Sequence, residues 1–259
     1  MITLKSLSYL ILISFVFYNA DIASSQKQNV ITNPQVIPKN IKVGPFFNGL
    51  KAIVTAQIPK CSGVIVKLVG KDQELKLNEK GKKAFIWLNV NQVNVKNAPS
   101  IYILTSTDKV SELCSDTVQE NEMLGYNSLK SKIVFDSKLP LSGIEFEEFI
   151  KFKEYNGCYN IDNNARVIPD SDGINILKAT LDIPSFISPD EYKAVIYCFD
   201  KGYVLDKVVV KLSVEEVGLP LIIKNLAEQS PAIYGILAVI IAMIAGSIIG
   251  LVFTKKRRK

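Results

Sequence analysis

Short apolar runs separated by turn-forming residues recur along most of the chain, and this pattern predicts a β-rich domain. The turns include Gly70-Lys71-Asp72, Lys80-Gly81-Lys82 and Asp200-Lys201-Gly202. The apolar or alternating runs lie at 52–56, 64–69, 84–90, 100–105, 174–181, 192–199 and 204–214. Short strands at this spacing are typical of β-sandwiches. We therefore expect a mainly β fold, with an immunoglobulin-like β-sandwich ectodomain over residues 41–218.

Residues 108–157 have a different period and predict a helical insertion in this domain. Ser142-Gly143-Ile144-Glu145 has the form of a capping box, and Phe146, Phe149 and Ile150 behind it share one face of a helix. Two separate sandwiches of about seventy residues each would be marginal in size. We therefore favour one continuous domain, and two small domains are the alternative.

The C-terminal part of the chain predicts a single C-terminal transmembrane helix. Residues 232–253 are twenty-two uncharged residues in succession, and a helix of that length rises about 33 Å, enough to cross a hydrocarbon core of about 30 Å. Five cations follow: Lys255, Lys256, Arg257, Arg258 and Lys259. These cations mark the cytoplasmic side and suit anionic lipid head groups. We expect a juxtamembrane helix at 219–230, a span at 231–254 and a basic tail at 255–259.

The first residues have the organisation of a secretory signal peptide. A short basic segment precedes an apolar stretch at 6–20, and Ala23 and Ser25 place small side chains where a signal peptidase cleaves. We expect a signal peptide at 1–25 and a linker at 26–40. The mature N-terminus would then lie outside the cytoplasm. The alternative is an uncleaved first segment, which would give two spans and place both termini inside.

Composition excludes several classes of function. The basic tail supplies five of the six net positive charges, and Arg166 is the only arginine between the first segment and the tail. Nucleic-acid recognition normally depends on several arginines, so we expect no nucleic-acid partner. The chain also has no histidine, which excludes Ser-His-Asp and Cys-His catalytic groups and histidine-based zinc sites. We expect no metal and no cofactor, and only carboxylate, lysine or thiolate chemistry is available.

The four cysteines predict two disulfide bonds. Cys61, Cys114, Cys158 and Cys198 are widely spaced and form no C-x-x-C pair. An even number of cysteines in an oxidising compartment favours disulfides over a zinc site. Three pairings are possible. We favour Cys114 with Cys158, which would tie the ends of the helical section, and Cys61 with Cys198, which would join the strand-rich halves. Buried free thiols are the alternative.

Several sequence blocks resemble an uncharacterised family of alphaproteobacterial transmembrane proteins. The blocks are Phe46-Phe47-Asn48-Gly49, Val64-Ile65-Val66-Lys67-Leu68, Trp87-Leu88-Asn89-Val90, Pro99-Ser100-Ile101-Tyr102, Ile183-Pro184, 192–197, Lys201-Gly202, Val217-Gly218 and 231–235. Leu88 departs from the methionine expected there, and the four cysteines are not part of the family pattern. The resemblance implies a periplasmic domain anchored in the bacterial inner membrane, with no established activity. A eukaryotic type I membrane protein has the same topology, and only the resemblance argues against it.

The predicted span also carries a possible contact surface for another helix. Small residues recur at every fourth position: Ala238, Ala242, Gly246 and Gly250. Such a face allows close approach of a second helix, either from another copy of the chain or from a polytopic membrane protein. The resemblance also suggests a permease of the sulfite-exporter type as a candidate partner beside the lipid bilayer.

Two functional hypotheses follow from these observations. The preferred one is a non-enzymatic, membrane-anchored periplasmic module that interacts with a membrane complex or transporter. The alternative is a periplasmic enzyme that depends on a thiol or on a carboxylate pair such as Glu147 with Glu148. The acidic pair has a simpler interpretation, because carboxylates near a helix N-terminus favour the helix dipole.

Overall fold

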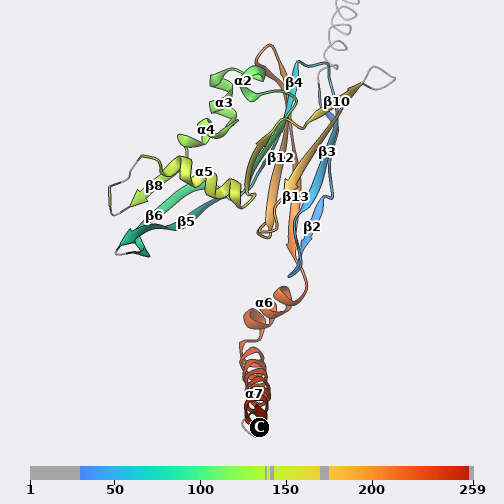
Figure 1. Ribbon diagram of the computed structural model, residues 1–259. Coiled ribbons are helices and arrows are strands. Elements are labelled where there is room, and N and C mark those ends of the chain that lie inside the picture. Colours follow the sequence, from blue (N-terminus) through green and yellow to red (C-terminus); the bar gives the residue numbers. More distant parts are fainter. Residues whose placement is uncertain (1–29, 84, 138, 141–142, 170–174, 257–259) are drawn as a thin grey trace, which may run out of the picture.

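This computed structural model describes residues 30–83, 85–137, 139–140, 143–169 and 175–256 (Figure 1). The predicted signal peptide at 1–25 lies outside the described residues, as do Arg257, Arg258 and Lys259 of the basic tail. The fold is mainly β and ends in one long apolar helix, which confirms these two parts of the predicted fold class.

Two sheets pack face to face and form a sandwich. The first sheet has the strand order β1 (Thr32–Ile37), β3 (Leu50–Ile58), β11 (Asn175–Ile183) and β10 (Arg166–Pro169). The second has the order β2 (Asn40–Val43), β13 (Tyr203–Glu216), β12 (Asp190–Asp200), β4 (Gly63–Val69), β7 (Tyr102–Ser106) and β9 (Tyr159–Asp162). Most neighbouring strands are antiparallel, but β2 pairs with β13 and β9 with β7 in parallel.

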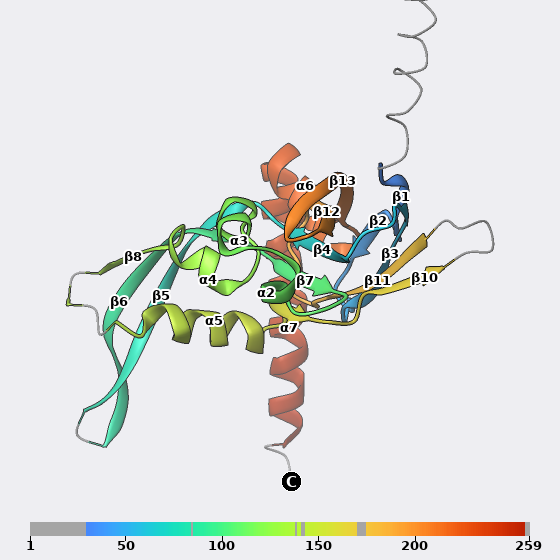
Figure 2. The same ribbon diagram turned by 90° about the horizontal axis from the view of Figure 1, so that it is seen from above.

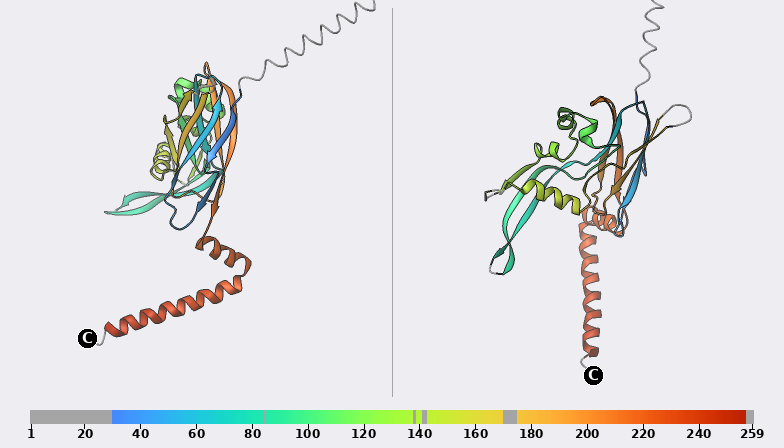
Figure 3. Two further views of the ribbon diagram at one scale, coloured as in Figure 1. Left: turned by 90° about the vertical axis from the view of Figure 1, so that its right-hand side faces the viewer. Right: turned by 45° about the horizontal axis from the view of Figure 1, so that its top comes forward.

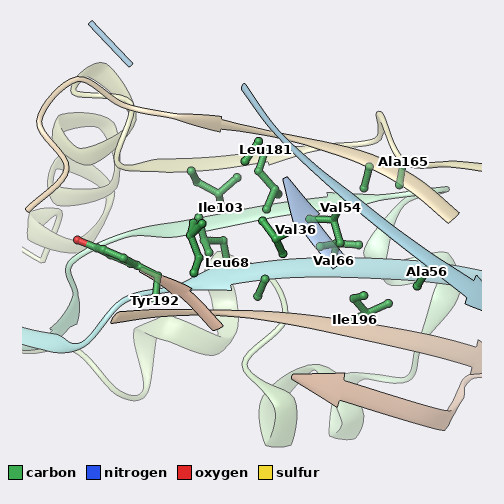
Figure 4. Close-up of a cluster of buried hydrophobic side chains, with 14 of the residues drawn as sticks. Val36, Val54, Ala56, Val66, Leu68, Ile103, Ala165, Leu181, Tyr192 and Ile196 are labelled. Atoms are coloured by element: carbon green, nitrogen blue, oxygen red, sulfur yellow. The ribbon is translucent and has the colours of Figure 1, made fainter. Parts of the chain in front are cut away.

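One hydrophobic core fills the space between the two sheets. Buried residues alternate with more exposed ones along β3 and β11, as expected for strands with one face turned inward. Val54 of the first sheet belongs to the same buried cluster as Val66 and Ile196 of the second. Figure 4 shows these side chains gathered between the strands. The period-2 pattern of the sequence thus encodes the inner face of the first sheet.

A second hydrophobic core lies on the other face of the second sheet. Here β4, β7 and the second half of β12 are buried on both faces, so their sequences are mostly apolar, with Lys67, Thr105 and Ser106 as buried polar exceptions. The covering helices are α2 (Val110–Leu113), α3 (Asp116–Glu122), α4 (Tyr126–Lys130) and α5 (Glu145–Tyr155). Phe149 of α5 and Leu129 of α4 pack in one cluster with Tyr197 of β12. The helical section therefore forms a third layer over the sandwich (Figure 2).

A third sheet, here called the arm, projects away from the sandwich (Figures 1 and 3). It consists of β5 (Asp72–Lys83), β6 (Ile86–Pro99) and β8 (Val134–Ser137) in the order β5-β6-β8. Val95 and Ala98 of β6 are fully buried and belong to the second core, so the arm is anchored at its base. The outer part of the β5–β6 hairpin extends beyond that support.

Two helices follow the last strand. Val217 donates a backbone hydrogen bond of 2.9 Å to Val43 at the end of β2, and Gly218 then takes a positive φ of 82° before α6 (Leu219–Gln229) begins. Only Ser230 separates α6 from α7 (Pro231–Lys256), which begins with proline, a residue that suits the first turn of a helix. The two helices occupy the regions predicted for the juxtamembrane helix and the span.

The structure corrects one predicted boundary and leaves another prediction open. Residues 26–40 are not simply a linker, because residues 32–37 form β1, which pairs with β3, and β2 begins at Asn40. The short mixed segment TNPQVI has little periodicity of its own, and only its pairing with β3 makes it a strand. The immunoglobulin-like form of the sandwich stays a prediction.

Gly49 provides a test of the packing between the first and last thirds of the domain. Its φ is +80°, and an added Cβ would lie 2.6 Å from the carbonyl oxygen of Ile183. We expect Gly49→Ala to lower the free energy of unfolding by about 3 kcal/mol, since backbone strain and the clash add together. Gly125→Ala is the matched control, because Gly125 has a φ of +92° but no atom within 4 Å of the added Cβ. Chemical denaturation followed by near-ultraviolet circular dichroism measures both, and equal losses would contradict the expectation.

Candidate functional site

Cys61 and Cys198 lie side by side at one end of the sandwich, and both are free thiols. Cys61 is half-buried in the turn between β3 and β4, whereas Cys198 is fully buried near the end of β12. Ser62 fixes this turn, because its backbone N–H and its hydroxyl each donate a hydrogen bond of 2.8 Å to the carbonyl oxygen of Phe199. The predicted partners Cys61 and Cys198 thus lie next to each other, but as free thiols and not as a disulfide.

The two thiols influence each other's ionisation. The Cys198 thiol donates a hydrogen bond to the sulfur of Cys61, which lowers the pKa of Cys61, although partial burial opposes this effect. The same hydrogen bond, together with burial, raises the pKa of Cys198 far above its ordinary value. The two thiols are therefore unequal: Cys61 is the more exposed and more acidic, and Cys198 the buried proton donor.

The predicted pairing of Cys114 with Cys158 is wrong. The carbonyl oxygen of Cys158 accepts a hydrogen bond of 2.9 Å from the backbone N–H of Tyr102 at the start of β7. Cys114 lies in the segment after the other end of β7, where Ser115 donates a backbone hydrogen bond to Gly202. Five residues of strand separate the two ends by about 13–16 Å, whereas a disulfide needs Cα atoms within about 7 Å. Burial raises the pKa of both thiols.

A pocket of about 490 Å³ opens beside Cys61. Its lining comes from the Cys61 turn, from the segment after β7 and from β10. The side chains that carry polar chemistry are Cys61, Ser62, Thr107, Asp108 and Arg166. Arg166 is the only arginine of the described residues, and its side chain is exposed. The pocket therefore offers one thiol with a cation and a carboxylate nearby.

A buried lysine on the opposite face of the second sheet was missed by the sequence analysis. Lys67 of β4 is only 7% exposed, and its ammonium group donates a hydrogen bond to the carbonyl oxygen of Glu122 at the end of α3. The Glu122 carboxylate accepts hydrogen bonds from the Tyr197 hydroxyl at 3.1 Å and from Lys207 at 2.7 Å. These hydrogen bonds attach the end of α3 to β4, β12 and β13 of the second sheet. The sequence signal that could have revealed it is a single lysine inside the apolar run 64–69.

The acidic residues Glu147 and Glu148 are exposed in the first turn of α5, where carboxylates favour the helix dipole. A hydrogen bond from its own backbone N–H lowers the pKa of Glu147, and so does the hydrogen bond of 3.2 Å that its carboxylate accepts from Lys130 of α4. Within the described part of the chain, no cluster of three or more cysteine and acidic residues is placed to hold a metal ion.

The outer end of the arm carries a group of exposed apolar side chains between lysines. We call this group the arm tip: Lys80, Lys82, Phe85, Ile86 and Leu88. Phe85 is 91% exposed and Ile86 62%, and the Lys82 ammonium lies 5.8 Å from the centre of the Phe85 ring. No periodicity in the sequence indicated this surface, because the strand pattern alone does not show where a hairpin leaves the core.

The predicted contact residues of α7 all lie on the helix surface. Ala238, Ala242, Gly246 and Gly250 are exposed, and a Cβ added at Gly246 would meet no atom within 4 Å. Lys255 and Lys256 form the last turn of α7, and the rest of the predicted tail is outside the described residues. Among the described helices, one is long and apolar enough to cross a membrane, over Pro231–Gly250.

A comparison with protein families finds one match that covers most of the chain. A family model described as "Putative transmembrane protein (Alph_Pro_TM)" matches residues 33–255. The match includes both sheets, the arm, the Cys61 pocket and almost all of α7. No curated protein and no solved structure matches the chain.

The burial of Lys67 leads to a prediction about how the stability of the fold depends on pH. Burial lowers the pKa of Lys67 from 10.5 to about 8, so between these pH values the unfolded chain holds a proton that the folded chain has released. Raising the pH through this window therefore favours the folded state, at up to about 1.4 kcal/mol per pH unit. We expect the wild type to gain stability relative to Lys67→Met from pH 8 to 10.

Denaturation of the purified protein in detergent at each pH measures this difference. Lys51→Met is the control for loss of one positive charge, because Lys51 lies exposed on β3. A difference between wild type and Lys67→Met that stays constant over the window would show that Lys67 keeps its proton in the folded protein.

Proposed function

Since the chain belongs to the Alph_Pro_TM family of transmembrane proteins, we propose that it is a membrane-anchored extracytoplasmic interaction module that docks onto a polytopic protein of the same membrane. The observation that carries this proposal is the arm tip, an exposed apolar and basic surface held away from a well-packed domain. The domain would lie in the periplasm of a bacterium, anchored in the inner membrane by α7 with its basic end in the cytoplasm.

The chemistry of the arm tip favours a partner protein. Burying an exposed Phe or Ile side chain stabilises a contact by about 1.5–3 kcal/mol, and exposed groups of such side chains mark interaction sites. The outer edge of the arm is β5, where Lys76 and Lys80 supply charge along the strand. Charged edge strands discourage pairing with a further strand. The partner is therefore expected to receive the apolar end of the hairpin rather than to extend the sheet.

The base of the domain supports a close approach to the bilayer. Leu219, Ile222 and Ile223 of α6 are exposed, and so is Phe46, which lies in the turn that packs beside Val217 and Gly218 just before α6. Helices with one apolar face lie in the membrane interface, with that face toward the acyl chains. With α6 at the interface, the domain stands directly on the membrane, where its arm can reach a neighbouring membrane protein.

The span supplies a second contact surface in this proposal. The small-residue face of α7 allows a partner helix to approach closely, and a polytopic protein offers both such a helix and an extracytoplasmic surface. A permease of the sulfite-exporter type is one candidate, and a second copy of the chain is the alternative occupant of the helix face. The interaction itself needs no cofactor and no catalytic group.

The first prediction concerns the arm tip. We expect the double variant Phe85→Asp with Ile86→Asp to lose its partner in affinity purification from detergent-solubilised membranes, by about tenfold or more, because the contact would lose its apolar centre. Tyr155→Asp is the matched control, since Tyr155 is equally exposed, at 91%, on the last turn of α5. Equal recovery of the same membrane proteins with wild type and the double variant would overturn the role of the arm.

The second prediction concerns the span. We expect Gly246→Leu and Gly250→Leu to weaken the association of α7 with its partner helix, since each leucine would hold the two backbones apart. Cysteine-free variants with a crosslinkable residue at position 238, on the same small-residue face, measure this contact in native membranes. Ile240→Leu, on the lipid-exposed surface of the same helix, is the control. If all three variants crosslink like the parent, α7 is an anchor and contributes no specific contact.

A further inference from the structure

Cys61 and Cys198 form a pair of reactive side chains to which the docking function gives no role. Two neighbouring thiols of unequal exposure, one facing a pocket and one behind it, have the arrangement of an attacking and a resolving cysteine. Cys61 lines the 490 Å³ pocket, and Cys198 is 0% exposed. Cys198 pairs with Val64 across the β12–β4 ladder, three residues along from Cys61. Strand pairing therefore sets the approach of the two thiols.

We propose that Cys61 and Cys198 form a thiol–disulfide exchange site that accepts small peptide-type disulfides bearing a carboxylate and an ammonium group. The proposal goes beyond the docking function, because it concerns the opposite side of the molecule from α7 and needs no partner membrane protein. It rests on the adjacency of the two thiols and on the polar groups of the pocket.

The exchange proceeds in two balanced steps. The Cys61 thiolate attacks one sulfur of the substrate disulfide, its S–S bond breaks, and one half leaves as a thiolate that takes up a proton. Cys198 then loses its proton to the solution and attacks the sulfur of Cys61. The Cys61–Cys198 disulfide forms, and the second half of the substrate leaves as a thiolate that is protonated. Two electrons pass from the protein dithiol to the substrate disulfide, which is reduced to two thiols.

The environment of each cysteine suits its role. Attack requires a thiolate at an accessible position, and Cys61 is half-exposed and accepts the hydrogen bond of Cys198. Resolution requires only that Cys198 reach Cys61, so the complete burial of Cys198 protects it from direct reaction with the substrate. Both hydrogen bonds from Ser62 to Phe199 hold the turn that carries Cys61 against β12, and so they keep the two thiols together.

The pocket explains the chemical class of the substrate. Arg166 and Asp108 lie in the same lining as Cys61, so the pocket presents opposite charges on one side of the thiol. The guanidinium of an arginine suits a carboxylate, and the carboxylate of an aspartate suits an ammonium group. An α-amino-acid disulfide carries both groups close to its sulfur atoms, and a γ-glutamyl disulfide carries both on its γ-glutamyl arm, whereas neutral disulfides carry neither.

Oxidation of the full-length protein in detergent by glutathione disulfide tests the site. The background variant Cys114→Ser with Cys158→Ser retains only the proposed pair. After reduction and removal of the reductant, we expect glutathione disulfide to convert this protein to the Cys61–Cys198 disulfide, with loss of two alkylatable thiols. In Cys198→Ala on the same background, we expect the mixed disulfide of Cys61 with glutathione to accumulate, as seen by intact mass. Cys61→Ser should give neither product.

Charge variants distinguish a built pocket from general thiol reactivity. We expect Arg166→Gln and Asp108→Asn each to slow the reaction with glutathione disulfide by about tenfold, the low end of electrostatic effects on association rates. Both should react with 2-hydroxyethyl disulfide at the parental rate, since that probe is neutral. Unchanged rates with both probes would overturn the substrate class. A background variant that keeps both thiols in excess glutathione disulfide, or a Cys61 thiol that never forms a mixed disulfide, would overturn the exchange site.

Discussion

Burial of β4, β7 and the second half of β12 on both faces is the constraint on which the rest of the domain depends. One face of these strands meets the first sheet across a core of small and branched side chains, and the other meets the helical layer across a core rich in tyrosine and phenylalanine. A strand with two buried faces cannot leave its hydrogen bonds or polar groups unpaired at low cost. The neighbouring elements are thereby held to one arrangement. Lys67 is an example, because its buried ammonium group needs the carbonyl oxygen of Glu122 as a hydrogen-bond acceptor.

The two candidate surfaces differ in how the central sheet supports them. The arm is attached to the second core only at its base, so its tip is free to present apolar side chains to a partner. The Cys61 pocket lies at the turn before β4, and the Ser62 hydrogen bonds to Phe199 hold this turn against β12. A projecting surface suits docking, whereas a chemical step needs groups held in a fixed geometry. Under the two proposals, the different attachment of these parts suits the arm tip for docking and the Cys61 pocket for chemistry.

Much of the architecture could be predicted from local patterns, and the exceptions have identifiable causes. Alternation along β3 and mostly apolar runs along β4 and β12 indicate strands, and the apolar face of α5 indicates a helix that packs on the sheet. The strand β1 could not be predicted, because pairing with β3 forms it rather than any periodicity of its own. The arm could not be predicted either, because the hydrophobic pattern of a strand is the same whether its hairpin packs on the core or extends away from it. For the cysteines, spacing permitted three pairings, and only the path of β7 separates Cys114 from Cys158.

The sequence by itself determined the apolar C-terminal helix, the β-rich character of the domain and the exclusion of histidine-dependent chemistry, because these follow from composition and from the period of nearby residues. Tertiary structure alone decided which thiols meet, which charges line the pocket at Cys61 and where the arm leaves the sandwich. These features depend on contacts between residues far apart in the chain, and a local pattern of hydrophobicity carries no information about which distant strands become neighbours.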